Sequence, residues 1–88
     1  MRPYYTFHTD IGHGWLAVPE RDLADVGLSA YSFSRYSFRK SDWFYLEEDC
    51  DMAKFMEAFR ARFGELPKLR EQYANGNSPI RRYRRVTQ

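Results

Sequence analysis

The chain has little of what marks secreted, membrane-spanning or disulfide-stabilised proteins. It contains a single cysteine, Cys50, which has no partner for an internal disulfide. It shows no signal peptide and no apolar run of the roughly 20 residues that a membrane-spanning helix needs. We therefore expect a protein of a reducing cytoplasm, either bacterial or of an infected host cell, with no membrane partner.

Residue patterns for catalysis or metal binding are also scarce. The metal-type side chains are His8, Asp10, His13 and Cys50 with its flanking carboxylates, and this set lacks the short paired spacings of a zinc site. The chain has no glycine-rich phosphate loop, and the aspartates on both sides of Cys50 should raise its thiol pKa and reduce its reactivity. We expect no enzyme, no metal and no cofactor.

What the chain does have is aromatic residues and unevenly placed charge. Its 88 residues are 18% aromatic and 43% hydrophobic, which is enough apolar surface for one small core. Residues 1–67 hold eight Lys/Arg against eleven Asp/Glu, whereas residues 68–88 hold six against one. We interpret 1–67 as a compact α+β domain and 68–88 as a basic C-terminal extension that could add an edge strand. The asymmetry indicates a charged partner.

Turn residues and apolar alternation predict the elements of the first half. Strands are expected at Tyr4–His8 and Trp15–Val18, on either side of a glycine-containing turn. Pro19 should begin a short helix that ends at Gly27, which can adopt the left-handed conformation. A long antiparallel hairpin is expected between Tyr31 and Leu46, with its turn at 39–42.

The second helix has the clearest pattern. After Asp49 or Asp51 as N-cap, apolar residues recur at helical spacing and Gly64 ends the run; they are Met52, Phe55, Met56, Phe59 and Phe63. A short helix is expected at 68–73 and a turn at 75–79. Together these predict an α+β fold: an antiparallel sheet of about four strands, with the 52–63 helix packed on a face and the shorter helix at an edge.

Two charged clusters are the candidate partner-binding residues. The acidic run before the second helix has more carboxylates than capping requires, and we expect Glu47 and Glu48 to be the least committed to capping. The C-terminal run interleaves arginines with an aromatic, a composition that can hold phosphates and stack on bases. The predicted partner-binding residues are Glu47, Glu48, Asp49, Asp51, Arg81, Arg82, Tyr83, Arg84 and Arg85.

Four segments carry a resemblance to known proteins: HGWLAVP at 13–19, VGL at 26–28, YLEEDCD at 45–51 and SPIR at 78–81. In these segments the chain resembles small uncharacterised proteins of bacteriophages and plasmids. Because such accessory proteins often inhibit host defence, the resemblance implies a non-enzymatic protein-binding inhibitor of a host protein complex, such as an anti-CRISPR acting on a CRISPR effector. The alternative is a nucleic-acid-binding accessory protein that uses the C-terminal Arg/Tyr cluster. Neither reading specifies an oligomeric state.

Overall fold

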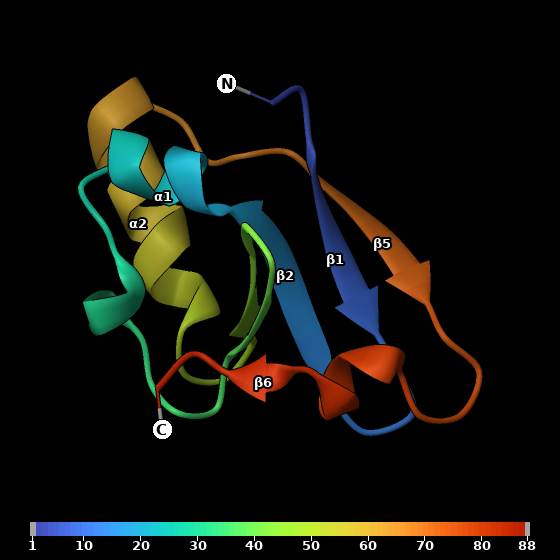
Figure 1. The fold of residues 1–88 in the computed structure, drawn as a ribbon. Helices are drawn as coiled ribbons and strands as arrows, with labels where there is room; N and C mark the ends of the chain where they lie inside the picture. The colour runs from blue at the N-terminus through green and yellow to red at the C-terminus, as the bar shows by residue number, and fades with distance from the viewer. Residues whose placement is uncertain (1, 88) are drawn as a thin grey trace.

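Six strands form one mixed sheet in the computed structural model, which describes residues 2–87 (Figure 1). The strand order is β5-β1-β2-β4-β3-β6, and only the β1–β5 pair is parallel. The bounds are β1 Tyr5–Thr9, β2 Gly14–Pro19, β3 Phe38–Lys40, β4 Trp43–Glu47, β5 Leu69–Tyr73 and β6 Arg84–Arg85. The α+β class is confirmed, but the expected four-stranded antiparallel sheet is wrong, because the chain after Pro67 adds a strand at each edge.

Helix α2 (Met52–Phe63) covers one face of the sheet, and its bounds match the expected ones. Phe55 and Phe59 are 0% and 3% exposed, and the Phe55 ring meets Tyr5 edge-on at a centroid distance of 5.2 Å. Gly64 has a φ of 82°, in the left-handed region that favours glycine, so the helix stops where the sequence indicated. Within residues 2–87, no helix has both the length and the apolar composition needed to cross a membrane.

Helix α1 (Glu20–Asp25) follows β2 directly and lies beside α2 (Figure 1). Its end is built as expected: Gly27 has a φ of 81°, and the Leu28 amide donates to the Leu23 carbonyl at 2.9 Å. The Tyr5 hydroxyl donates to Asp22 at 2.9 Å, and its burial together with this bond raises the pKa of Tyr5. A helix of two turns is thus held by the first strand as well as by its own apolar residues.

The segment before β3 is not the strand that its alternation predicted. Residues Ala30–Ser32 form a 3₁₀ helix, η1, and the hairpin is confined to β3 and β4 with a tight turn at Ser41. The reason is hydrogen bonding by serine: Ser34 and Ser37 both donate to the Asp51 carboxylate, which is 0% exposed. Asp51 is the N-cap residue of α2, but its side chain holds this loop and does not cap the helix.

The C-terminal residues extend the sheet at both edges and place a short helix on its other face. The 68–73 segment, expected as a helix, is instead strand β5, because its backbone pairs with β1 from Tyr5 to Thr9. A second 3₁₀ helix, η2 (Pro79–Arg82), then places Ile80 against Trp15 and Phe38 in a small second cluster. The two helices thus pack on one face of the sheet and η2 on the other, while β5 and β6 form its edges (Figure 1).

This packing predicts that alanine substitutions at two aromatic positions differ strongly in their effect on the free energy of unfolding. Phe59→Ala should lower the free energy of unfolding by about 3 kcal/mol, because it removes buried apolar surface and leaves a cavity. Tyr31, 97% exposed, is the matched control, and Tyr31→Ala should change stability by less than about 0.5 kcal/mol. Urea unfolding of the three proteins measures both values, and equal midpoints for Phe59→Ala and the parent would contradict the assigned core.

Candidate functional site

The C-terminal segment is anchored by a single carboxylate, Asp10, in the turn between β1 and β2. Its Oδ1 accepts the amides of Gly12 and His13 at 3.0 Å each, and its Oδ2 accepts the Ser78 amide at 2.8 Å. Arg81 of η2 donates to both oxygens, from Nε at 2.7 Å and from Nη2 at 2.9 Å. The Asp10 side chain is 0% exposed, so five donors converge on a carboxylate that water does not reach.

These donors stabilise the charged form of Asp10. The Arg81 guanidinium, more than any other group, holds the pKa of the Asp10 carboxyl well below its usual range. The same hydrogen bond raises the pKa of Arg81. Gly12 leaves room for this approach, since a Cβ added there would lie 3.0 Å from Arg81 Nη2 and the guanidinium would have to shift slightly. The pair therefore fixes residues 78–81 against the first turn of the chain.

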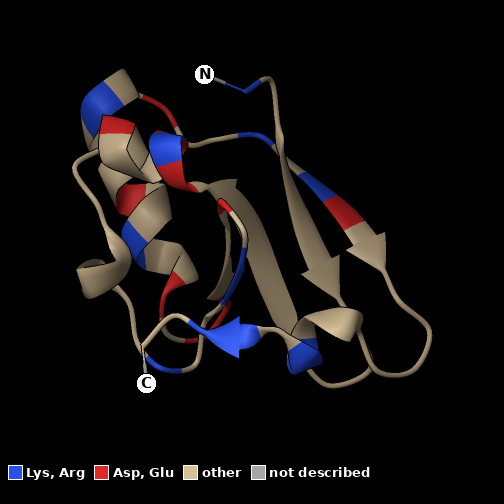
Figure 2. Ribbon diagram, viewed as in Figure 1, with Lys and Arg blue, Asp and Glu red and all other residues tan. Residues whose placement is uncertain are grey.

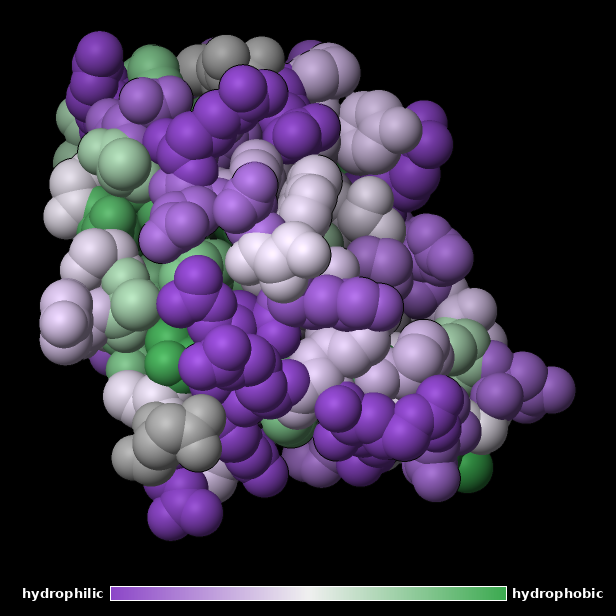
Figure 3. Space-filling model, viewed as in Figure 1, coloured by the Kyte–Doolittle hydropathy of each residue, from purple (hydrophilic) through white to green (hydrophobic). Residues whose placement is uncertain are grey.

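The anchored segment brings cations from two parts of the chain into one groove of about 520 Å³. Arg39 and Lys40 come from β3, Arg82 from η2 and Arg84 from β6. Because successive residues of a strand point to opposite faces of the sheet, Lys40 lies over the Tyr83 ring, whereas the Arg39 guanidinium lies 4.8 Å from the ring centroid of Phe44 on the helix side. Figure 2 shows the same concentration of positive charge on η2, β6 and β3, and in Figure 3 hydrophilic side chains gather over this part of the face in view. The residues that line the groove, which we call the cationic groove, are Arg39, Lys40, Ser41, Pro79, Arg82, Tyr83 and Arg84.

No carboxylate lines the cationic groove. Its four cations, two from β3 and two from the C-terminal segment, form no ion pair with any residue between 2 and 87. The Lys40 ammonium lies 4.9 Å from the centroid of the Tyr83 ring, which in turn packs against Tyr45 at 5.1 Å. Among residues 2–87 these cations thus have no carboxylate partner, and Lys40 lies over an aromatic ring.

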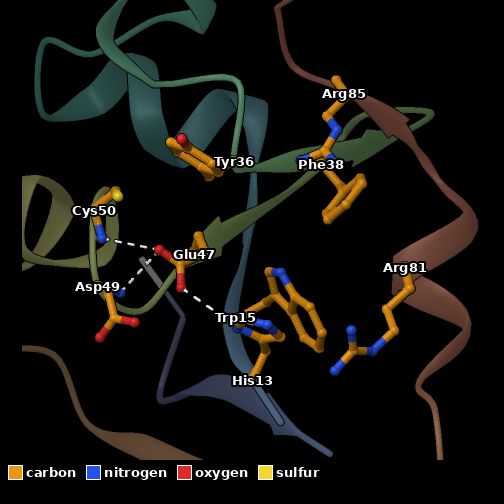
Figure 4. A pocket seen from close by; sticks show the side chains of 9 residues that line it. All are labelled: His13, Trp15, Tyr36, Phe38, Glu47, Asp49, Cys50, Arg81 and Arg85. Atoms are coloured by element: carbon orange, nitrogen blue, oxygen red, sulfur yellow. Dashed lines mark hydrogen bonds and ion pairs between the residues drawn. The ribbon is translucent and has the colours of Figure 1, made fainter.

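A second hollow, of about 470 Å³, adjoins the groove along β6 (Figure 4). Arg84 lines the groove and the next residue, Arg85, lines this cavity. Its walls are aromatic, from Trp15, Tyr36 and Phe38. Charged groups of both signs complete it; they are Glu47, Asp49, Arg81 and Arg85, with His13 and Cys50 beside them.

One buried polar atom beside this cavity has no partner. Trp15 is 2% exposed, and its indole N–H has no hydrogen-bond acceptor among residues 2–87. A buried donor left unpaired costs on the order of 1–3 kcal/mol. Above it, the Arg81 guanidinium carbon lies 5.5 Å from the centroid of the indole ring.

The predicted acidic residues divide into structural and free ones. Glu47 is 7% exposed, and its Oε1 accepts the amides of Asp49 and Cys50 at 3.0 Å each. The expectation that Glu47 is uncommitted is therefore wrong, because it closes the turn before α2. Asp51 is fully buried by the serine loop, whereas Glu48 and Asp49 are exposed.

The predicted basic residues divide in the same way. Arg81 is occupied by Asp10, while Arg82 and Arg84 line the cationic groove and Arg85 lines the cavity. Tyr83 is partly buried in the groove floor. Members of both sets meet in the cavity, where Glu47 and Asp49 lie with Arg81 and Arg85.

Sequence reasoning missed the contribution of β3 and of the β1–β2 turn. Arg39 and Lys40 looked like turn residues, but pairing of Arg39 with Arg84 across β3 and β6 adds them to the C-terminal cations. Asp10 looked like a weak metal ligand, although it is the anchor of the arginine segment. An aspartate two residues before a glycine in a hairpin turn could have indicated amide capture, but not its partner 71 residues away.

The chemistry of Cys50 follows its surroundings. It is exposed, and desolvation together with Glu47 and the neighbouring aspartates raises the pKa of its thiol. The thiolate that a nucleophile or metal ligand requires is thus disfavoured. Between residues 2 and 87, no three His, Cys, Asp or Glu side chains are grouped so that they could hold a metal ion.

The lowered pKa of Asp10 predicts a defined pH dependence of stability. A carboxyl whose pKa is lower in the folded state stabilises the fold above its unfolded-state pKa of about 3.9, and this contribution is lost as the pH falls through the folded-state pKa. Asp10→Asn should therefore cost about 2 kcal/mol at pH 7, and the difference from the parent should narrow below about pH 4. Urea unfolding between pH 2.5 and 7 measures it.

Asp25→Asn, a change at an exposed carboxylate of α1, is the control and should stay within about 0.5 kcal/mol of the parent at each pH. A penalty for Asp10→Asn that is the same at pH 3 and pH 7 would show that the charge of Asp10 does not anchor the segment.

Comparison of this chain with protein-family models, with curated proteins and with solved structures found no match.

Proposed function

We propose that this protein binds single-stranded nucleic acid through the cationic groove, and that it acts by binding and not by catalysis. The observation that carries the proposal is that Arg39, Lys40, Arg82 and Arg84 line one hollow without a single carboxylate. Four unpaired cations in a groove attract a ligand that carries several regularly spaced negative charges. A phosphate backbone is such a ligand, and its binding releases condensed counterions.

The aromatic residues favour a single strand over a duplex. Tyr83 lies in the groove and Tyr36, 55% exposed, lies at the mouth of the adjoining cavity. Unpaired bases can stack on such rings, whereas the bases of a duplex are already stacked on one another. The cations would follow the backbone while the tyrosines contact the bases.

The acidic residues are less available to a charged partner than the basic ones are. Glu47 and Asp51 are buried and accept hydrogen bonds from the backbone or from serines, so neither is free to meet a partner's cation. The raised pKa of the Cys50 thiol likewise gives little support to a nucleophilic enzyme.

A second candidate is the protein-binding inhibitor of a host defence complex that the resemblance implies, of the anti-CRISPR kind. The observation that favours it is strand β5, whose five residues are all exposed and whose outer edge is unpaired among residues 2–87. Leu69 and Tyr73 are 40% and 59% exposed there, and Glu48 and Asp49 remain free elsewhere. An inhibitor acting through these groups would lose its target upon Glu48→Lys with Asp49→Lys, a change that leaves the cationic groove intact.

The first candidate predicts a salt-sensitive affinity that depends on three arginines. A variant with Arg39→Ala, Arg82→Ala and Arg84→Ala should bind a fluorescein-labelled 12-nucleotide single strand at least roughly tenfold more weakly at low salt, because three phosphate contacts are lost. The slope of log K against log salt should fall by roughly two. Fluorescence anisotropy between 50 and 300 mM salt measures both quantities.

The control carries Arg21→Ala, Arg60→Ala and Lys68→Ala, which remove the same charge from exposed positions outside the groove. It should keep most of the parent's affinity, and a duplex of the same sequence should bind the parent more weakly than the single strand. Equal losses in the two triple variants, or a parent that binds no oligonucleotide at 50 mM salt, would overturn the proposal.

A further inference from the structure

We infer that a single strand held in the cationic groove continues across the part of the sheet face that η2 leaves uncovered, and that Arg70 of β5 binds its far end. This inference rests on the proposed function, because it gives the course and the minimum length of the same ligand. The binding site is then longer than the groove. Cations of β3, η2 and β6 lie at one end, and a cation of the opposite edge strand lies at the other.

Alternation along the strands places Arg70 on the same face as η2. Tyr5 belongs to the core under α2, so Thr6, the next residue of β1, points to the opposite face. Arg70 pairs directly with Thr6 across β1 and β5 and therefore shares that face. Tyr45 of β4 lies there too, since it packs against the cluster that contains Ile80 of η2.

Two further hollows lead from the groove to Arg70. The first, of about 160 Å³, shares Tyr83 with the groove and extends to Tyr45. The second, of about 220 Å³, is lined by Ala17 and Thr6. Ala17 pairs with Tyr45 across β2 and β4, and Thr6 pairs with Arg70, so the hollows follow one another across neighbouring strands.

The surface without carboxylates extends along this path. Among residues 2–87, no Asp or Glu lines either of the two hollows. Glu71 follows Arg70 in the chain, but it pairs with Phe7 and lies on the face that the helices cover, where it accepts a hydrogen bond from the Thr9 hydroxyl at 3.0 Å. A polyanion that crosses the uncovered face thus meets no like charge.

Arg70 is available to a phosphate. It is exposed and forms no ion pair with any residue between 2 and 87. Its guanidinium carbon lies 4.0 Å from the centroid of the Tyr4 ring, and a guanidinium over a ring can still donate from its N–H groups to phosphate oxygens. Arg2 is a weaker candidate, because the Asp22 carboxylate lies 3.7 Å from its Nε.

The separation of the two ends requires a strand. Lys40 on β3 and Arg70 on β5 are four inter-strand steps apart, and steps of about 4.8 Å give roughly 19 Å. One phosphate cannot contact both residues, whereas several nucleotides can span the distance. Small single-strand-binding domains such as OB-folds cover roughly 4–16 nucleotides, so a site of this length is of ordinary size.

Arg70→Gln tests the far end of the path. It should weaken the binding of d(T)₁₂ at least roughly threefold in anisotropy titrations, and lower the slope of log K against log salt by roughly one, because one phosphate contact is lost. The affinity for d(T)₃, whose two phosphates are too few to span the face, should not change. Arg60→Gln removes the same charge from an exposed position of α2 and should leave both affinities unchanged.

Thr6→Glu tests the middle of the path without removing a cation. The new carboxylate should repel the strand and weaken d(T)₁₂ at least roughly threefold, while d(T)₃ in the groove keeps its affinity. Ala53→Glu adds the same charge at an exposed position of α2 and should not weaken d(T)₁₂. Thermal melting establishes that all four variants are folded.

The Nε–H group of Arg70 gives an independent readout. Its ¹H–¹⁵N resonance, assigned by its absence in Arg70→Gln, should shift as d(T)₁₂ is added and saturate with the same Kd, but should not shift with d(T)₃. Equal effects of Arg70→Gln and Arg60→Gln on d(T)₁₂, or an Arg70 resonance that does not move, would overturn the extended path and leave the groove proposal standing. A parent that binds no d(T)₁₂, or that binds a 12-residue glutamate peptide equally well, would overturn both.

Discussion

The ion pair between Asp10 and Arg81 is the interaction on which the placement of the C-terminal segment from Ser78 onward depends. It joins the first turn of the chain to η2 through a two-point contact, with the Asp10 side chain wholly shielded from water. Without it, the 3₁₀ helix would be held against the sheet chiefly by Ile80 and the partly buried Tyr83. A pair of this kind contributes specificity of position, because removing one partner leaves a buried charge unsatisfied.

Position matters here because the cationic groove and the adjoining cavity both lie between the C-terminal segment and the rest of the sheet. Arg82 and Arg84 reach Arg39 and Lys40 only when η2 and β6 are docked, and Arg81 itself forms part of the cavity over Trp15. Arg81 thus has a structural role: its ion pair with Asp10 holds the neighbouring Arg82 and Arg84 in a fixed arrangement. A flexible basic tail would offer the same charge but no groove and no cavity beside it.

Local patterns predicted the parts of the fold whose cause is local. The stripe from Met52 to Phe63 and the glycines that end both helices specify those helices through spacing and backbone freedom alone. The serine loop and strand β5 were missed because partners far away in the sequence decide them: Asp51 for Ser34, and β1 for Leu69–Tyr73. For the same reason the arginine run could be identified as a candidate site from the sequence. The anchoring of that run by Asp10, and the positions of Arg39 at the groove and Trp15 at the cavity, could not.

In the proposed function, a strand of nucleic acid lies across β3, β6 and η2, where the fold holds the cations in place. A disordered basic tail would not position the strand in this way. Zero-length ultraviolet cross-linking of a bound 12-nucleotide single strand, followed by peptide mass spectrometry, tests this claim most directly. The account predicts cross-links within 35–40 and 79–85, with Tyr36, Phe38 and Tyr83 as the reactive rings. Cross-links confined to α2 or β5, or none under conditions where anisotropy reports binding, would contradict it.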